Sequence, residues 1–304
     1  MKLKNVISAA DFNPNLIKSV FTIADKIKAN NFKKNALAGK IMATLFYEPS
    51  TRTRLSFESA MTRLGGSVIS TENASEFSSA AKGETLEDTI RIIDGYCDLI
   101  VLRHPKIGSA KIAAQYSDVP VINGGDGGGE HPSQGLLDLY TIFSKTKNSS
   151  FTIVMSGALS TYRSVHSLCI LLANYPQKVK IIFVSPQNLR IPSDFRNHLK
   201  TKKIQFEETE NFNTSLKKAD FLYQTRIPKE YLSKTEFKKY QNQYVLNKKS
   251  MSFMKSNSFV MHPLPRINEI HPEVDSDSRA IYFEQAQNGV YIRMALLLTI
   301  FDKD

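Results

Sequence analysis

The sequence predicts an α/β protein of two domains, each with a mainly parallel sheet flanked by helices, and with the active site in the cleft between them. Three observations predict this fold class. The 304 residues are enough for two ordinary hydrophobic cores. Short apolar runs alternate with segments whose apolar residues recur at helical spacing. This alternation runs through the chain twice, with a polar joint at residues 145–150.

The first domain follows from the first series of apolar runs. Residues 40–48 (KIMATLFYE) are apolar and partly β-branched or aromatic, which indicates a buried strand. Phe57, Ala60 and Leu64 then share one face of a helix, which two glycines end. Further along we expect a helix at 82–96, strands at 98–105 and 119–129, and a helix that starts near Pro132.

The second domain follows from the second series. We expect strands at residues 148–157, 179–186, 204–209, 220–225 and 258–265, and an amphipathic terminal helix at 283–304. The terminal helix is expected to pack back on the first domain. The predicted boundaries are therefore 1–133 plus 288–304 for the first domain, and 134–287 for the second.

Composition restricts the class of protein. Hydrophobic residues make up 41% and charged residues 23%, and no apolar run approaches the roughly 18 residues of a membrane span. The first residues lack a long apolar segment with a cleavage signal, so we expect a cytoplasmic protein. Cys97 and Cys169 are far apart and lack metal-ligand spacing. We therefore expect buried thiols in a reducing compartment, no metal and no other cofactor.

The net charge of +11 raises the alternative of a nucleic-acid-binding protein. The lysines, however, are scattered, with only modest clusters at residues 26–35 and 234–249. The sequence contains no helix-turn-helix, zinc-finger or RNP-type signature. A basic surface that serves anionic small substrates is the preferred interpretation, with no nucleic-acid or membrane partner.

Residues 46–66 concentrate hydroxyl and guanidinium groups where the first strand turns into a helix. At this point the first N–H groups of the helix lack partners and the helix dipole is positive. Hydroxyls and guanidinium groups in such a place favour a phosphate ligand, and the residues concerned are Ser50, Thr51, Arg52 and Thr53. The alternative is that Ser50 or Thr51 is an ordinary N-cap beside solvated arginines.

More polar residues follow other apolar, strand-like runs. They are Arg103 and His104, His131 and Gln134, Arg163, Arg226, and His262 with Arg266. Several arginines beside a hydroxyl-rich helix start predict a cleft for a ligand with several negative charges. A lone histidine is more often structural, but these neighbours favour a functional role for His131. The glycines at 124–129 would let the backbone approach such a ligand closely.

At these residues the chain resembles the catalytic chains of the aspartate carbamoyltransferase family. The resemblance rests, in order along the chain, on FYEPSTRTRLSFESAMTRLG, AKGETLEDT, VLRHP, NGGDGGGEHPSQGLLDLYTI, RSVHSL, TRIPKE and VMHPLPRINEI. It covers essentially the whole sequence, and the S-T-R-T and H-P-x-Q signatures are specific to carbamoyltransferases. It implies that carbamoyl phosphate and L-aspartate react to give N-carbamoyl-L-aspartate and phosphate, in pyrimidine biosynthesis.

Ornithine carbamoyltransferases are the rival within the superfamily. That branch usually has His-Cys-Leu-Pro where this chain has residues 262–265 (HPLP), and a Ser-Met-Gly type element where this chain has Thr225 and Arg226. An arginine suits a dicarboxylate better than a cationic diamino acid. The resemblance therefore favours the aspartate branch.

The resemblance implies roles for the residues of the carbamoyl phosphate site. The phosphate would be held by Ser50, Thr51, Arg52 and Thr53. The carbamoyl oxygen would be polarised by Thr53, Arg103 and His131. The carbamoyl amide would be held by Gln134 and by the carbonyl groups of Pro263 and Leu264.

The resemblance also implies an aspartate site and a shared assembly. Arg163 and Arg226 would bind the carboxylates of L-aspartate. Ser78 and Lys82 would lie on a loop that reaches into the active site of the neighbouring subunit of a homotrimer, where Lys82 would also contact aspartate. The sequence leaves open whether regulatory chains attach to the trimer.

Four residues depart from the pattern of the family, all in the second domain or its closure. Ala158 replaces an acidic residue, and Tyr162 replaces a glycine, so Arg163 is expected to be loosely held. Pro228 replaces a glutamine that could contact aspartate, and Tyr231 replaces an arginine that would pair with Glu48. Three interpretations remain: an aspartate carbamoyltransferase with altered closure, a carbamoyltransferase for another amino acid, or a weakly active binding or assembly subunit.

Overall fold

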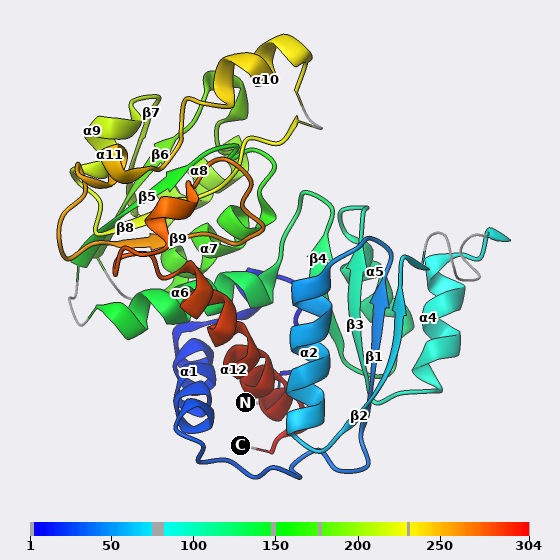
Figure 1. Ribbon diagram of the computed structural model, residues 1–304. Helices are drawn as coiled ribbons and strands as arrows, with labels where there is room; N and C mark the ends of the chain where they lie inside the picture. The colour runs from blue at the N-terminus through cyan, green and yellow to red at the C-terminus, as the bar shows by residue number, and fades with distance from the viewer. Residues whose placement is uncertain (1–2, 75–81, 147–149, 176–177, 230–231, 304) are drawn as a thin grey trace.

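The computed structural model describes residues 3–74, 82–146, 150–175, 178–229 and 232–303. It contains two parallel sheets, which confirms the predicted fold class (Figure 1). The first has the order β2-β1-β3-β4, with β1 Ile41–Phe46, β2 Ser67–Glu72, β3 Leu99–His104 and β4 Val121–Asp126. The second has the order β7-β6-β5-β8-β9, with β5 Ser150–Ser156, β6 Lys178–Val184, β7 Gln205–Thr209, β8 Phe221–Gln224 and β9 Phe259–Met261.

Helices connect and cover these strands. The α-helices are α1 Pro14–Lys28, α2 Thr51–Arg63, α4 Leu86–Asp94, α5 Ser109–Tyr116, α6 Pro132–Lys145, α7 Arg163–Asn174, α8 Ser193–Thr201, α9 Phe212–Leu216, α10 Lys234–Tyr240, α11 Lys248–Met251 and α12 Tyr282–Phe301. Short 3₁₀ helices lie at η1 Ala9–Asp11, η3 Gln187–Leu189 and η5 Pro272–Val274. Each predicted strand overlaps an observed one, although β6 begins one residue before its predicted range. In the first domain, α1, β2 and α5 were not predicted.

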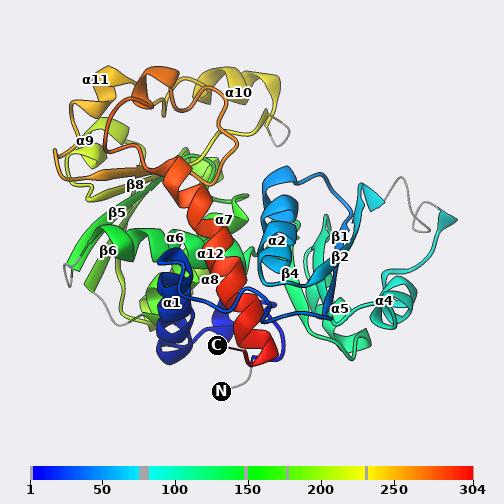
Figure 2. The ribbon, with the colours of Figure 1, turned by 60° about the horizontal axis from the view of Figure 1, so that its bottom comes forward.

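The main hydrophobic core lies between the two sheets. It joins apolar side chains of α1, α2, α6, α7 and α12 with those on one face of each sheet. Figures 1 and 2 show α12 running between the two sheets, beside α1 and α6. Two smaller clusters cover the opposite faces of the second and first sheets. The junction between β1 and α2 lies next to the second domain, because Glu48 of this junction pairs with Arg163 at the start of α7.

The prediction of an amphipathic terminal helix is wrong for most of α12. Every residue from Ile292 to Ile300 is buried, and so are the polar residues Gln285 and Asn288. The reason is tertiary: α12 packs against α1, α2 and α6 at once, so little of its circumference reaches solvent. Its polar side chains form internal hydrogen bonds instead of a solvated face.

The cysteines and the helices can be compared with the predictions made from composition. Cys97 and Cys169 are both buried free thiols, as predicted. Within the described part of the chain, none of the helices combines the length and apolar character needed to cross a bilayer.

Candidate active site

The start of α2 has the properties of an anion site. Ser50 is the N-cap residue, but its side chain forms no capping hydrogen bond, so the ordinary N-cap interpretation is wrong for its hydroxyl. The first turn contains Thr51, Arg52 and Thr53 and has no acidic residue. Thr51 and Arg52 are exposed, whereas Thr53 is buried. The first N–H groups of a helix have no partner within the helix, so those of this turn, together with the nearby guanidinium, can serve a bound anion.

Thr53 and His131 link α2 to the start of α6. Thr53 Oγ1 and His131 Nε2 are hydrogen-bonded at 3.2 Å, and both side chains are buried. The backbone N–H of His131 donates to Ser167 Oγ of α7 at 2.9 Å. Burial lowers the pKa of His131 well below its ordinary value, and the nearby arginines, first Arg163, act in the same direction. His131 is therefore a neutral imidazole, which suits hydrogen bonding to a substrate oxygen better than acid–base exchange.

Glu48 joins two of the predicted arginines. Its Oε1 accepts from Arg103 at 3.1 Å and from Arg163 at 3.2 Å, although these residues lie on different domains. Arg103 also donates to the Gly124 carbonyl at 3.2 Å, and Arg163 to the Gly127 carbonyl at 2.7 Å. Burial lowers the pKa of Arg103 to about 10, and Arg163 contributes while Glu48 opposes the shift. One carboxylate thus faces two guanidinium groups, and the site keeps a net positive charge.

The expectation that Arg163 is loosely held is wrong. Its guanidinium has two partners, and the φ of Tyr162 is −90°, which any residue adopts without strain. Ala158 is fully buried where an acidic residue was expected. Tyr162 instead has a new role, because its hydroxyl accepts from Arg226 Nε at 3.1 Å. The tyrosine therefore ties Arg226 to the residue that precedes Arg163 in the chain.

Of the other two residues that depart from the family pattern, the structure describes only Pro228. Pro228 is buried. Tyr231 lies outside the described residues, and so does Ser78, whereas Lys82 is described and its side chain is exposed. The sequence analysis expected Glu48 to lose a closure partner; in the structure Glu48 pairs with Arg103 and Arg163.

The turn after β9 carries the two carbonyl groups that the sequence analysis assigned to the site. The N–H of Leu264 donates to His262 Nδ1 at 2.8 Å, and His262 Nε2 lies 2.8 Å from Glu269 Oε1. Pro263 and Leu264 are half-buried. The histidine therefore fixes the turn and does not itself offer a free nitrogen to a ligand.

Two other polar residues at strand ends are structural. Arg266 pairs with Asp275 and donates to the Tyr282 hydroxyl at 2.9 Å. His104 Nδ1 lies 2.8 Å from Ser109 Oγ. Arg266 and His104 thus form contacts with nearby protein residues that stabilise the fold.

Sequence reasoning missed a buried carboxylate behind Gln134. Gln134 Nε2 donates to Asp138 Oδ1 at 2.9 Å, and Asp138 is fully buried in α6. Burial raises the pKa of Asp138 to about 7, although hydrogen bonds from Tyr223, Gln285 and Gln134 oppose the shift. The available signal was an acidic residue within the apolar run at 136–140 (LLDLY), where ordinary helix faces exclude charge.

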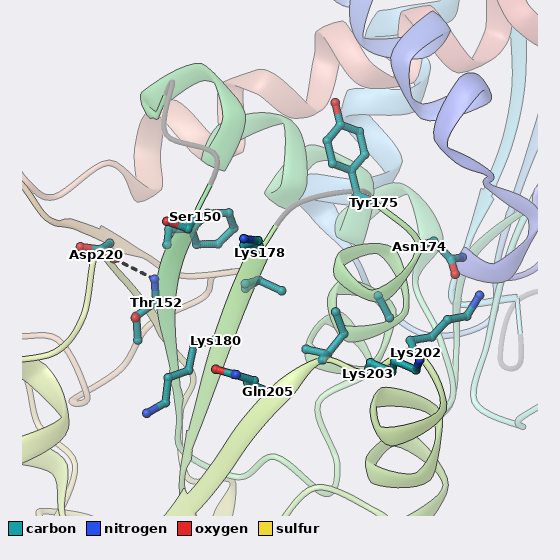
Figure 3. A pocket seen from close by; sticks show the side chains of 14 residues that line it. Ser150, Thr152, Asn174, Tyr175, Lys178, Lys180, Lys202, Lys203, Gln205 and Asp220 are labelled. Atoms are coloured by element: carbon teal, nitrogen blue, oxygen red, sulfur yellow. Dashed lines mark hydrogen bonds between the residues drawn. The ribbon is translucent and has the colours of Figure 1, made fainter.

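A cavity of about 930 Å³ lies elsewhere, at the amino ends of β5, β6 and β7 (Figure 3). Lys178, Lys202 and Lys203 on its wall are exposed, and Asp220 is already paired with Lys255 and the Thr152 N–H. Ligands of open parallel sheets bind at the carboxyl ends of the strands. The arginine cluster, and not this cavity, is therefore the candidate active site.

Comparison with known proteins identifies the family. Two family models match the chain: "Aspartate/ornithine carbamoyltransferase, carbamoyl-P binding domain" over residues 4–144, and the "Asp/Orn binding domain" of the same family over residues 149–300. The chain belongs to the aspartate/ornithine carbamoyltransferase family. The boundary between the two matched domains falls between α6 and β5, where the sequence has its polar joint.

Curated members of this carbamoyltransferase family are similar over nearly the whole chain. Aspartate carbamoyltransferase 1, chloroplastic, of Pisum sativum is 48% identical over 302 residues, which cover 97% of this chain and 78% of the relative. The aspartate carbamoyltransferase catalytic subunit of Clostridium novyi is 46% identical over 300 residues, which cover 98% and 97%.

Solved carbamoyltransferase structures share the fold. The aspartate transcarbamoylase of Trypanosoma cruzi in complex with N-(phosphonacetyl)-L-aspartic acid superposes with a TM-score of 0.91 at 37% identity, covering 98% of this chain and 96% of that chain. The catalytic subunit of the M. jannaschii enzyme gives a TM-score of 0.90 at 42% identity, covering 99% of both chains.

Among the described residues of the present chain, no group of three or more histidine, cysteine or acidic side chains is arranged to hold a metal ion.

Proposed function

We propose that this protein is an aspartate carbamoyltransferase, which transfers the carbamoyl group of carbamoyl phosphate to the amino group of L-aspartate. The products are N-carbamoyl-L-aspartate and phosphate, and the reaction belongs to pyrimidine biosynthesis. The observation that carries the proposal is the cationic cluster at the junction of the two domains. There Glu48 holds Arg103 and Arg163 together, and the buried Thr53–His131 pair completes the site.

Carbamoyl phosphate occupies the side of the site formed by α2 and the end of β3. Ser50, Thr51, Arg52 and Thr53 bind its phosphate through N–H groups, hydroxyls and a guanidinium. Two features of α2 support this assignment: the Ser50 side chain forms no capping hydrogen bond, and the first turn has no acidic residue. The carbamoyl oxygen lies among donors from Thr53, Arg103 and His131.

Chemistry then proceeds by direct attack. The neutral amine of aspartate forms a C–N bond to the carbamoyl carbon, the bond from that carbon to the phosphate oxygen breaks, and the leaving phosphate takes the proton from the amine. Negative charge develops on the carbamoyl oxygen, so fixed donors around it stabilise the transition state. The neutral state of His131 supports its use as such a donor. Holding both substrates in one cleft supplies the orientation.

L-Aspartate binds on the second domain. Arg163 and Arg226 bind its two carboxylates, and a guanidinium fork matches a carboxylate well. Arg163 pairs with Glu48, so an incoming carboxylate competes with a carboxylate already present. Residues 1–133 with 288–304 and residues 134–287 are proposed as the two bodies that close on the substrates.

Tyr162→Phe tests the aspartate half of the site. We expect the KM for aspartate to rise about three- to tenfold, because Arg226 Nε loses the hydroxyl that orients it. The KM for carbamoyl phosphate should change less than twofold. Steady-state kinetics with each substrate varied in turn provide the measurement. An unchanged aspartate KM would remove Tyr162 from the account of the site.

We also propose a homotrimer with shared active sites, in which Lys82 reaches the site of the neighbouring subunit. An exposed apolar surface on β2 and α4 supports a contact between copies. Ile69 of β2 is 39% exposed and Ile92 of α4 is 47% exposed, and Tyr96 just after α4 is 59% exposed. Lys82 precedes α4 and is exposed. Large apolar side chains gathered on one surface are typical of a protein interface.

A cytoplasmic location is part of the same proposal. Cys97 and Cys169 are buried as free thiols, which supports a reducing compartment.

A bisubstrate ligand tests the proposed function. N-(phosphonacetyl)-L-aspartic acid carries a phosphonate and two carboxylates on one molecule, so it would engage both halves of the site at once. We expect it to bind at least about 100-fold more tightly than inorganic phosphate, because the second half binds without a new loss of translational freedom. Calorimetry on the purified protein would measure this. Equal affinities for the two ligands would contradict a site that holds both substrates together.

A further inference from the structure

A buried carboxylate lies behind the proposed carbamoyl site and receives three hydrogen bonds. Asp138 Oδ1 accepts from Gln134 Nε2 at 2.9 Å and from Gln285 Nε2 at 2.6 Å, and its Oδ2 accepts from the Tyr223 hydroxyl at 2.7 Å. The side chains of Asp138, Gln285 and Tyr223 are buried, and Gln134 is half-buried. These residues come from α6, α12 and β8, so the carboxylate joins three elements.

The His262 backbone N–H and the ionised form of Asp138 together orient this network. The backbone N–H of His262 donates to Gln285 Oε1 at 2.8 Å, and a backbone N–H can only donate. The amide nitrogen of Gln285 must therefore face Asp138. When Asp138 is ionised its carboxylate can only accept, so the amide nitrogen of Gln134 then faces Asp138 as well. Because the amide is planar, its Oε1 then points away from Asp138.

The charge of the network is also compensated. Arg293 of α12 is buried, its guanidinium lies 5.0 Å above the Phe57 ring of α2, and its charge favours the ionised form of Asp138. A buried charge without hydrogen bonds or an opposite charge would be costly. The chain thus keeps an ionisable carboxyl here together with the groups that stabilise it.

We propose that Asp138 is a positioning residue that makes the site selective for a carbamoyl group. By holding the amide nitrogen of Gln134, it turns the Gln134 oxygen toward the NH₂ group of carbamoyl phosphate. Through Gln285 and the His262 N–H, it fixes the turn that presents the Pro263 and Leu264 carbonyls to the same NH₂ group. This inference rests on the proposed function and deepens it.

The consequence is discrimination between two ligands of nearly equal shape. Acetyl phosphate has a methyl group where carbamoyl phosphate has NH₂, so it cannot donate to these acceptors. Acceptors that stay unpaired in a buried site weaken binding of such an analogue. If Asp138 sets the acceptors, its removal should weaken carbamoyl phosphate binding and leave acetyl phosphate binding nearly unchanged.

The test compares dissociation constants of the two ligands, measured by calorimetry on the full chain without aspartate. In Asp138→Leu we expect the Kd for carbamoyl phosphate to rise about tenfold and the Kd for acetyl phosphate to change less than twofold. Asp138→Asn keeps an oxygen for the two glutamines, so it should restore most of the discrimination. Gln285→Leu keeps the carboxylate and should lower the ratio of the two constants about threefold.

Asn288→Leu is the matched control. Asn288 lies one turn further along α12, and its amide donates to Thr141 Oγ1 of α6 at 3.0 Å. It makes the same type of contact between α12 and α6 without touching Gln134. We expect Asn288→Leu to leave the ratio of the two dissociation constants unchanged.

Two results would overturn the inference. The first is that the affinities for both ligands fall together in Asp138→Leu, which would mean that the network only supports the fold. If Asp138→Leu does not fold, the same result in Gln285→Leu has the same meaning. If the ratio stays at its wild-type value in the folded variants, Asp138 has no part in selecting the carbamoyl group. A wild-type protein that does not bind carbamoyl phosphate at all would contradict the proposed function itself, which keeps the two failures apart.

Discussion

Arg103→Ala is expected to lower kcat for carbamoyl transfer about 10²- to 10³-fold, the size of the loss when one donor to a developing oxyanion is removed. Arg103 is nearly buried and is held in place by Glu48 and the Gly124 carbonyl. A guanidinium fixed before the reaction needs no reorganisation when the charge develops. Steady-state assays at saturating carbamoyl phosphate and aspartate provide the measurement.

Two further variants make the Arg103 result specific. Arg103→Lys keeps a positive charge without the planar fork, so its kcat should fall between those of the wild type and Arg103→Ala. Arg196→Ala removes an arginine that pairs with Glu208 on α8 and β7, outside the proposed site, and should stay within about twofold of the wild type. A kcat for Arg103→Ala within tenfold of the wild type would remove Arg103 from the oxyanion site.

Mixing two inactive variants, Lys82→Ala and His131→Ala, is expected to restore activity. In a trimer with shared sites, each site takes His131 from one subunit and Lys82 from its neighbour. Random exchange would leave about a quarter of the sites with neither substitution, so activity should approach about a quarter of the wild-type value. Each variant alone should lose at least about 100-fold.

The control for this experiment is the same mixture under conditions that prevent subunit exchange, which should stay inactive. Exchange itself can be followed by mass spectrometry of differently labelled subunits. A mixture that exchanges and still stays inactive would place Lys82 in the site of its own subunit or outside catalysis.

The sequence was enough to predict the parts of the fold that depend on local chemistry. The apolar β1 run, the hydroxyl-rich start of α2 and the position of Arg103 at the end of β3 were all found as predicted. The strand β2 was missed because it is an edge strand with no fully buried side chain, so it lacks a clear apolar pattern. The helix α1 could have been predicted, since Asn13 caps it and Pro14 begins it.

The partners within the site could not be predicted, because they come from distant parts of the chain. Glu48 contacts arginines 55 and 115 positions away, and Asp138 contacts a glutamine 147 positions away. The terminal helix α12 was predicted to be amphipathic, since nothing in its local sequence shows that three helices surround it. The prediction of a loosely held Arg163 failed for the same reason, because its partners are tertiary.

The most direct test of the proposed function is a turnover assay with carbamoyl phosphate and a panel of amino acids, with products identified by mass spectrometry. The panel includes L-aspartate, L-glutamate and L-ornithine. We predict N-carbamoyl-L-aspartate as the main product, with a kcat/KM for aspartate at least about 100-fold above that for any other member of the panel, because two arginines select two carboxylates at a fixed spacing. Transfer to another amino acid in preference to aspartate, or phosphate binding without turnover of any amine, would contradict the account.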